Sequence, residues 1–308
     1  MYLRSVWGSG QPSPQGWNHA GVTRHLYRCP LRWADMDQLG HVNNVTYVDY
    51  LQEARVDMLR VHPPVPGGEA LAEGVVVVRH EVQYVHPLVF RTQPVNVEVW
   101  VSEVRAATFT LAHEIFDETP EGRRVYLRAR SVLTPYVFDA ERPRRLRPEE
   151  REVLERFLEP EPQRLAPAVT LGEPAGERHT YDCAVRFSDV DAYRHVNNVK
   201  YFEYFQEARI AMVTAMRGLP DEGSDSGGLG VVVARIDVDY RSPMFFREQP
   251  YEVETWVSHV GRSSFVIDGH IRDGQQILSS ARAVMVAFDA ATQRSRELTE
   301  QQRAALLT

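Results

Sequence analysis

Apolar positions along the chain follow two periods, first that of a strand and then that of a helix. Residues 25–33 alternate around Tyr27 and Cys29, which is typical of a strand. Residues 43–60 carry apolar side chains at helical spacing, begin with Asn and contain no Gly or Pro, so they predict one long helix. Four strand-like runs rich in Val, Tyr, Phe and Thr follow, at residues 75–85, 95–104, 108–116 and 125–138. This order predicts an α+β unit in which an antiparallel sheet curls around the helix.

The same order occurs twice, because the chain is an internal repeat. Residues 32–55 (RWADMDQLGHVNNVTYVDYLQEAR) match residues 186–209 (RFSDVDAYRHVNNVKYFEYFQEAR) at 14 of 24 positions with a constant offset of 154. After a slip of two residues, Tyr84 and Trp100 align with Tyr240 and Trp256. Solenoid and propeller repeats run at roughly 20 to 50 residues, so this period indicates a duplicated domain.

The repeat sets the expected domain boundaries. We expect an N-terminal extension at residues 1–24, a first domain at 25–140, a linker at 141–178 and a second domain at 179–308. The linker is predicted to contain a short helix at 148–158, and its counterpart is a tail helix at Thr299, where Thr299 and Gln302 have capping-box spacing. Loops rich in Pro and Gly are expected at 62–68 and 220–230. A length of 308 residues fits two units of about 150.

Composition excludes several classes of function. The net charge of −7 gives no electrostatic footprint for nucleic acid. No run approaches the roughly 18 apolar residues of a membrane span, and the first 24 residues are polar, so we expect a cytoplasmic protein without a membrane partner. Cys29 and Cys183 are the only cysteines and form no CxxC pair. GxSxG, P-loop, GxGxxG and HExxH motifs are absent, and we expect neither a metal nor an organic cofactor.

The candidate chemistry lies in the turn before each long helix, which reads DxDxxGHVNN in the first repeat and DxDxxRHVNN in the second. A helix N-terminus presents unpaired N–H groups and the positive end of the helix dipole, so it can stabilise an oxyanion. An Asp or His beside it can activate water, or the carboxylate can attack directly. The catalytic candidates of the two repeats are Asp37, His41, Asp191 and His195.

A structural interpretation competes with the catalytic one, because Asp and Asn are common in turns and helix caps. Capping needs one or two polar side chains, whereas five are retained in both copies, so catalysis is favoured for the second Asp and the His of each motif. Asn43 and Asn197 are equally well explained as caps or as ligands. The first Asp of each motif, Asp35 and Asp189, is expected to pair with a nearby Arg.

Two acidic residues of the long helices, Glu53 and Glu207, have weaker claims to a catalytic role. Each lies within a QEAR segment, where we interpret it as pairing with the Arg that follows (Arg55 or Arg209) or as a packing residue.

At these residues the sequence resembles the hotdog-fold acyl-CoA thioesterases of the 4-hydroxybenzoyl-CoA thioesterase type, whose motif runs DxDxxGHVNNxxYxxYxxxAR. Both copies fit, so the chain resembles a tandem double hotdog. The resemblance implies that the two hotdog units pair edge to edge as an internal pseudodimer with acyl thioester sites at the interface. It also implies a catalytic carboxylate at Asp37 and Asp191, and backbone N–H groups after His41 and His195 that polarise the thioester carbonyl.

The second copy departs from this pattern at one position. Arg194 stands where the first copy has Gly40, and its side chain is expected either to crowd the turn or to reach a CoA phosphate. Tandem acyl-ACP thioesterases share the HVNN turn but carry an additional Asn where this chain has Leu39 and Tyr193. Hydratases of this fold use a DxNPxH turn that the chain lacks.

The sequence therefore predicts an acyl-CoA thioester hydrolase in which an Asp activates water. Acyl-ACP hydrolysis and non-catalytic binding of an acyl thioester are the alternatives. Hotdog pairs often associate further, so a homo-oligomer of the double-hotdog chain is an open option. The residues expected to contact substrate are Asn43, Asn44, Asn197, Asn198 and Arg194.

Overall fold

The structure is a computed structural model that describes most of the chain. The described residues are 17–19, 22–64, 71–161, 169–216, 230–289, 292 and 294–308. The expected N-terminal extension and the two loops predicted at 62–68 and 220–230 therefore lie largely outside the described residues. None of the helices in these ranges is long and apolar enough to span a bilayer.

Each repeat contains a strand, a long helix and four further strands, in the predicted order. The elements of the first repeat are β2 (Val22–Cys29), α1 (Thr46–Val61), β3 (Val75–Tyr84), β4 (Val95–Val104), β5 (Phe109–Thr119) and β6 (Gly122–Val137). Those of the second are β8 (His179–Cys183), α3 (Asn198–Ala215), β9 (Val231–Tyr240), β10 (Tyr251–Val260), β11 (Ser264–Asp273) and β12 (Gln276–Asp289). Short elements complete the fold: β1 (Trp17–His19), β7 (Arg142–Pro143), α2 (Pro148–Glu155), β13 (Arg294–Ser295) and α4 (Glu300–Ala305).

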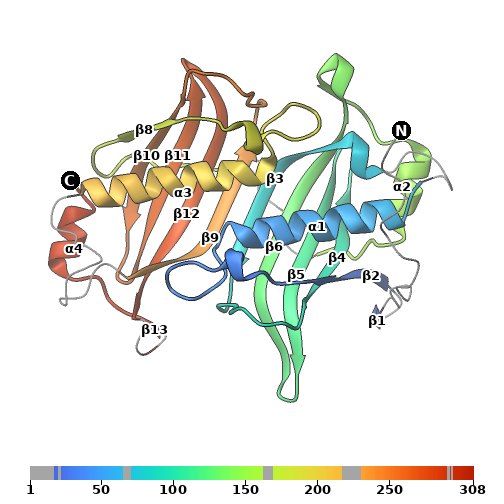
Figure 1. Cartoon of the computed structure of the whole chain (residues 1–308), viewed down its shortest axis with the longest axis horizontal. Coiled ribbons are helices and arrows are strands. Elements are labelled where there is room, and N and C mark those ends of the chain that lie inside the picture. The colour runs from blue at the N-terminus through green and yellow to red at the C-terminus, as the bar shows by residue number, and fades with distance from the viewer. Residues whose placement is uncertain are drawn as a thin grey trace.

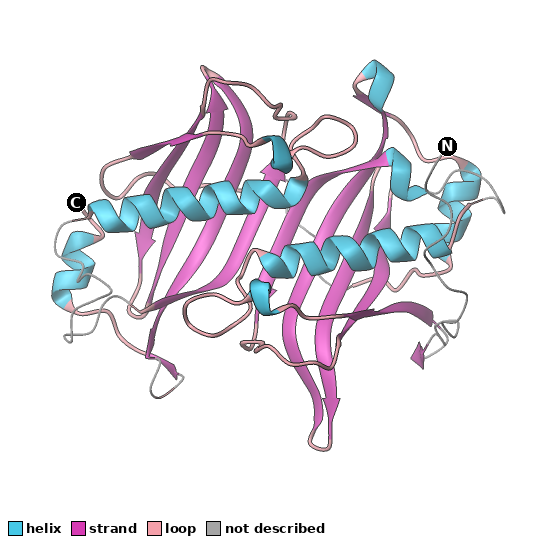
Figure 2. Ribbon diagram, in the orientation of Figure 1, coloured by secondary structure: helices cyan, strands magenta, loops and turns pink. Residues whose placement is uncertain are grey.

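The strands form one antiparallel sheet that runs through both repeats, and both long helices lie on the same face of it (Figures 1 and 2). The two halves of the sheet join where β3 pairs with β9, in a register that sets Glu81 opposite Asp237. Alternate residues of the strands point toward the helices, as in β4, where Val95, Val97 and Val99 are fully buried. The α+β fold with two sheets wrapped around two helices and paired edge to edge is confirmed.

The helices pack because their apolar stripes face the sheet. In α1 the buried side chains include Val48, Leu51, Ala54 and Met58, which recur every three or four residues. The capping box predicted at the tail is present, because the Thr299 hydroxyl accepts a hydrogen bond from the Gln302 N–H and the Gln302 side chain accepts from the Thr299 N–H.

The first strand of each repeat ends earlier than predicted. It stops at Cys29 and Cys183, and short 3₁₀ turns follow at Trp33–Asp35 and Phe187–Asp189. In the first repeat Pro30 supplies no N–H for a strand ladder. In both repeats the Asp that ends the 3₁₀ turn accepts a hydrogen bond from the backbone N–H three residues earlier, which closes the turn.

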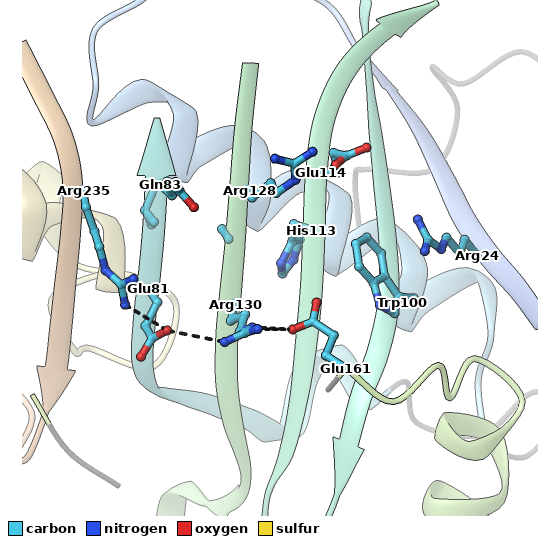
Figure 3. A pocket seen from close by; sticks show the side chains of 12 residues that line it. Arg24, Glu81, Gln83, Trp100, His113, Glu114, Arg128, Arg130, Glu161 and Arg235 are labelled. Atoms are coloured by element: carbon cyan, nitrogen blue, oxygen red, sulfur yellow. Dashed lines mark hydrogen bonds and ion pairs between the residues drawn. The ribbon is translucent and has the colours of Figure 1, made fainter. Parts of the chain in front are cut away.

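Charged side chains cover the sheet face opposite the helices, across the β3–β9 junction (Figure 3). Glu81 lies 3.1 Å from Arg235 of the second repeat and 3.9 Å from Arg130, which also pairs with Glu161. The chain between the repeats lies against this face, because Gly172 donates its N–H to Asp268 and accepts a hydrogen bond from the indole of Trp256. The end of the linker is thus attached to β10 and β11 of the second repeat.

Candidate functional site

The Asp191 carboxylate organises the turn before α3. Its Oδ1 accepts hydrogen bonds from the backbone N–H groups of Tyr193 (2.8 Å) and His195 (3.3 Å). The Asp191 N–H donates to the His195 carbonyl at 2.8 Å, and its carbonyl accepts from the Arg194 N–H. Such local bonds are typical of Asp in turns, so the structural role considered from the sequence is real. They occupy only one of the two carboxylate oxygens.

Asp191 also borders a cavity of about 640 Å³ between the two repeats. The cavity is bordered by α1, by the start of β3, by the end of β6 and by the HVNN turn of the second repeat. Four consecutive valines of β3, residues 75–78, form part of its apolar wall. Oδ2 of Asp191 has no hydrogen-bond partner among the described residues, so it is available to accept a bond from a water in this cavity.

His195 borders the same cavity, and aromatic rings surround its imidazole. Its ring centroid lies 5.2 Å from that of Phe245 in an edge-on arrangement and 6.0 Å from that of Phe138. Phe138 belongs to the first repeat and stacks on Tyr193 at 3.8 Å, nearly parallel. The aromatic rings around His195 therefore come from both repeats.

The two Asn residues of the turn have different roles. Asn197 caps α3, since its Oδ1 accepts a hydrogen bond from the Val199 N–H at 3.0 Å. Asn198 is the first residue of the helix, and its backbone N–H has no acceptor in the described part of the chain. Both side chains border the cavity. The N–H of Asn198 is therefore a hydrogen-bond donor at the positive end of the helix dipole, beside Asp191.

The first-repeat turn has the same local geometry. Asp37 Oδ1 accepts from the N–H groups of Leu39 (2.9 Å) and His41 (3.1 Å), and Asn43 Oδ1 accepts from the Val45 N–H at 2.9 Å. Asn197 is thus the cap of α3, whereas Asn43 makes the same local bond just before α1, which begins at Thr46. A contact of either Asn with substrate stays a prediction. A smaller cavity, of about 320 Å³, borders Asn43 of this turn together with Asp189 and Tyr204 of the second repeat.

Gly40 and Arg194 occupy equivalent left-handed positions, with φ of +76° and +66°. Gly adopts this conformation without strain, whereas the side chain of Arg194 makes it unfavourable. The Arg194 side chain is exposed and is not among the residues that border the cavity. A contact between Arg194 and a CoA phosphate stays a prediction.

Asp35 and Asp189 are structural, as expected, but their partners differ from those predicted. Asp35 Oδ2 accepts hydrogen bonds from the Arg32 backbone N–H at 2.8 Å and from the Tyr50 hydroxyl at 2.5 Å. Asp189 Oδ2 accepts the equivalent bonds from Arg186 and Tyr204, both at 2.8 Å. The Arg contributes its backbone rather than its guanidinium, because the carboxylate closes the 3₁₀ turn.

Sequence reasoning missed Arg55, which borders the cavity from α1. Arg55 is only 8% exposed, whereas Glu53 is exposed, so the two side chains do not share an environment. Burial lowers the pKa of Arg55 to about 10, partly offset by Tyr240 of the second repeat. The helical spacing contained the signal, because position 55 falls on the apolar stripe of α1 and position 53 does not. A buried cation thus enters the site across the interface.

A further cavity, of about 280 Å³, lies on the opposite face of the sheet (Figure 3). Its charged side chains pair with one another, as Arg130 does with Glu161 and Arg128 with Glu114. We interpret it as part of the charged surface that joins the repeats. No group of three His, Cys, Asp or Glu side chains within the described ranges is arranged to hold a metal ion.

Solved structures of two thioesterases match most of this chain and nearly all of their own chains. The 12:0-ACP thioesterase of Umbellularia californica matches 89% of this chain and 94% of its own with a TM-score of 0.66 and 16% identity. An acyl-ACP thioesterase of Bacteroides thetaiotaomicron matches 85% of this chain and 97% of its own, with a TM-score of 0.61 and 16% identity. At this identity the similarity shows the fold, which is a tandem hotdog.

Sequence comparison points to the same group. The Bacillus subtilis protein YsmA, which is uncharacterized, is 32% identical over 127 residues, or 40% of this chain and 82% of YsmA. The model of the thioesterase-like superfamily matches residues 31–157 and again residues 185–306, once in each repeat. Because the two matches together cover most of the chain, the protein belongs to the thioesterase-like superfamily.

Proposed function

We propose that the protein hydrolyses acyl-CoA thioesters to free CoA and a carboxylic acid, with the chemistry at the Asp191 turn. The observation behind it is that Asp191 and Asn198 border the same partly apolar cavity between the repeats, and that Oδ2 of Asp191 and the N–H of Asn198 have no partner among the described residues. Membership of the thioesterase-like superfamily supports the reaction class.

The proposed reaction needs only a base, an oxyanion donor and a good leaving group. Asp191 Oδ2 takes a proton from water as the water oxygen attacks the thioester carbonyl carbon. The Asn198 N–H donates to the developing oxyanion, which the helix dipole also stabilises. The intermediate collapses as the carbon–sulfur bond breaks, and the thiolate of CoA takes the proton from Asp191. His195 holds Asp191 through its backbone N–H and borders the thioester position with its ring.

Acyl-ACP is the alternative carrier, because two whole-length structural neighbours are named as acyl-ACP thioesterases. The chain itself lacks the additional Asn of that motif at Leu39 and Tyr193. The two carriers share the acyl thioester and differ in what lies outside the cavity, so the same acyl group must be offered on each.

Steady-state hydrolysis of acyl-CoAs of several chain lengths, and of the same acyl groups on ACP, tests the proposal. We expect Asp191→Asn to lower kcat by at least a hundredfold with the fold intact, since it removes the base. Asp37→Asn and the double variant measure how much of the hydrolysis takes place at the first-repeat turn. Full activity in the double variant contradicts the role of the carboxylates. Stoichiometric binding of acyl-CoA without turnover by the wild type identifies a non-catalytic binder instead.

A further inference from the structure

A buried histidine of the first repeat contacts the candidate site of the second. His80 on β3 is 2% exposed, and its Nε2 lies 3.3 Å from the side-chain Nδ2 of Asn198. Its other ring nitrogen, Nδ1, lies 2.9 Å from the hydroxyl of Ser131, which is 1% exposed on β6. Ser131, His80 and Asn198 therefore form a buried chain of hydrogen bonds that crosses from the first repeat to the cavity of the second.

The partners of His80 fix its tautomer. Burial and the neighbouring charge of Arg55 lower the pKa of His80 well below 6.5, so the ring is neutral and has one donor and one acceptor nitrogen. The Asn198 amide nitrogen can only donate, so Nε2 is the acceptor. The proton then lies on Nδ1, which donates to the Ser131 hydroxyl. This arrangement holds the Asn198 amide in one orientation, with Oδ1 turned away from His80.

The second repeat lacks this chain of hydrogen bonds. The two-residue slip that aligns Tyr84 with Tyr240 also aligns His80 with Ile236. The residue paired with His80 across the strands is Ser131, whereas the residue paired with Ile236 is Ala283. Two apolar side chains thus replace the histidine and the serine, and neither can accept a hydrogen bond.

Asn44, in the first-repeat turn, lacks the hydrogen bond that His80 forms with Asn198. Asn44 occupies the position equivalent to Asn198, and the two residues share one contact, since Tyr84 and Tyr240 donate their hydroxyls to the respective backbone carbonyls. The side-chain Nδ2 of Asn44, however, is buried and has no hydrogen-bond partner in the described structure. The two turns therefore have the same backbone contact, but only the side-chain amide of Asn198 has a hydrogen-bond partner in the described structure.

We propose that the Ser131–His80 pair is a positioning device that the first repeat supplies to the Asp191 site, where it holds the Asn198 amide and makes this site the productive one of the two. The proposal rests on the proposed function. His80 acts through Asn198, so it is a positioning residue and contributes no proton to the reaction.

Steady-state kinetics of four variants test this role. We expect His80→Ile, which installs the second-repeat residue, to lower kcat about tenfold and leave KM within about twofold, the effect of one lost neutral hydrogen bond. His80→Gln offers an amide oxygen where Nε2 stands, so it should restore most of kcat. Ser131→Ala should fall between the two. Ile236→Val, at the equivalent buried position of β9, is the matched control and should keep kcat.

Wild-type kcat in a folded His80→Ile variant overturns the proposal, and so does a His80→Gln variant as slow as His80→Ile. A readout that needs no activity separates this inference from the proposed function. Nitrogen-15 NMR of histidine-labelled full chain should show His80 protonated at Nδ1 from pH 8 to pH 5, with an Nε2 resonance that moves in Asn198→Ala. A ring protonated at Nε2, or charged at pH 6, overturns the inference even if thioesters are hydrolysed. A wild type that hydrolyses no thioester instead removes the proposed function.

Discussion

The Tyr204 hydroxyl donates a hydrogen bond to the Asp189 carboxylate at 2.8 Å, and this bond attaches the helix α3 to the turn that precedes it. The same carboxylate oxygen closes the 3₁₀ turn through the Arg186 N–H, and Asp189 is only 5% exposed. Tyr50 and Asp35 repeat the contact in the first half, where the carboxylate is half-buried. The Tyr at this place in the motif therefore sets the position of the preceding turn relative to the helix.

Removing this hydroxyl should destabilise the protein. We expect Tyr204→Phe to lower the free energy of unfolding by about 1–2 kcal/mol, because a buried carboxylate loses one of its donors. Tyr50→Phe is the matched variant and should lower the free energy of unfolding by less, since water can reach Asp35. Urea denaturation of the two variants measures both changes. Equal losses, or none at Tyr204, would contradict this account of the turn.

The left-handed backbone at Arg194 predicts a stabilising substitution. Arg194→Gly should raise the free energy of unfolding by about 0.5–1 kcal/mol, because Gly adopts a φ of +66° without a steric penalty. Gly40→Arg should lower it by a similar amount. The control is Ala192→Gly, at a position without positive φ, where added freedom of the unfolded chain should destabilise. Thermal unfolding compares the three, and a less stable Arg194→Gly variant would show that the Arg side chain contributes more than the strain costs.

Much of this fold follows from local sequence patterns. The strand at 95–104 was predicted to the residue, because its alternation of Val with polar residues is regular. The internal repeat predicts two copies of one domain, and the resemblance to double-hotdog proteins implies their edge-to-edge pairing, which the structure shows between β3 and β9. The ends of the first strands were wrong, because the carboxylates of Asp35 and Asp189 close 3₁₀ turns that apolar periodicity does not reveal.

The candidate site was predictable only in part, because the motif lies within one repeat, whereas residues of both repeats border the cavity. Asp191 and His195 could be found from their spacing before the helix. Helical spacing indicates that Arg55 is buried, but no local pattern places Arg55 at this cavity or His80 beside Asn198, since both come from the other repeat. The comparison that finds His80 is between the repeats themselves, because Ile236 at the equivalent position identifies it as a place where the two halves diverged.

Two buried histidines of the first repeat should make the protein sensitive to acid. Burial lowers the pKa of His113 to about 3 and that of His80 well below 6.5, with Arg55 adding to both shifts. The unfolded chain therefore binds more protons than the folded one between pH 6.5 and about 3, and the free energy of unfolding falls as pH falls through this window. Above pH 6.5 both histidines are neutral in the folded and in the unfolded chain, so their contribution to the free energy of unfolding no longer changes with pH.

His113→Leu tests this dependence at one of the two positions. Neither ring nitrogen of His113 has a hydrogen-bond partner of good geometry among the described residues, so a similar apolar side chain should be tolerated. The slope of unfolding free energy against pH between 6.5 and 5 should decrease by up to about 1.4 kcal/mol per pH unit. Urea titrations at pH 7.5, 6.0 and 5.0 measure it, with the exposed His259→Leu as control. An unchanged slope would mean that His113 is protonated equally in both states.

The two buried arginines of the long helices should separate stability from activity. Arg55 and Arg209 are equivalent, both are nearly inaccessible to water, and burial lowers the pKa of each to about 10. Nη1 of Arg209 is buried without a partner in the described structure, so Arg209→Met should leave stability unchanged or raise it by about 1 kcal/mol. Under the proposed reaction, Arg55→Met removes a positive charge from the wall of the Asp191 cavity and should lower kcat/KM about ten- to hundredfold, because a cation bordering the cavity would favour a developing oxyanion. Urea denaturation and acyl-CoA hydrolysis on both variants test the pair. Equal kinetic losses would mean that both turns catalyse, whereas no loss in Arg55→Met would show that its charge does not act on the thioester.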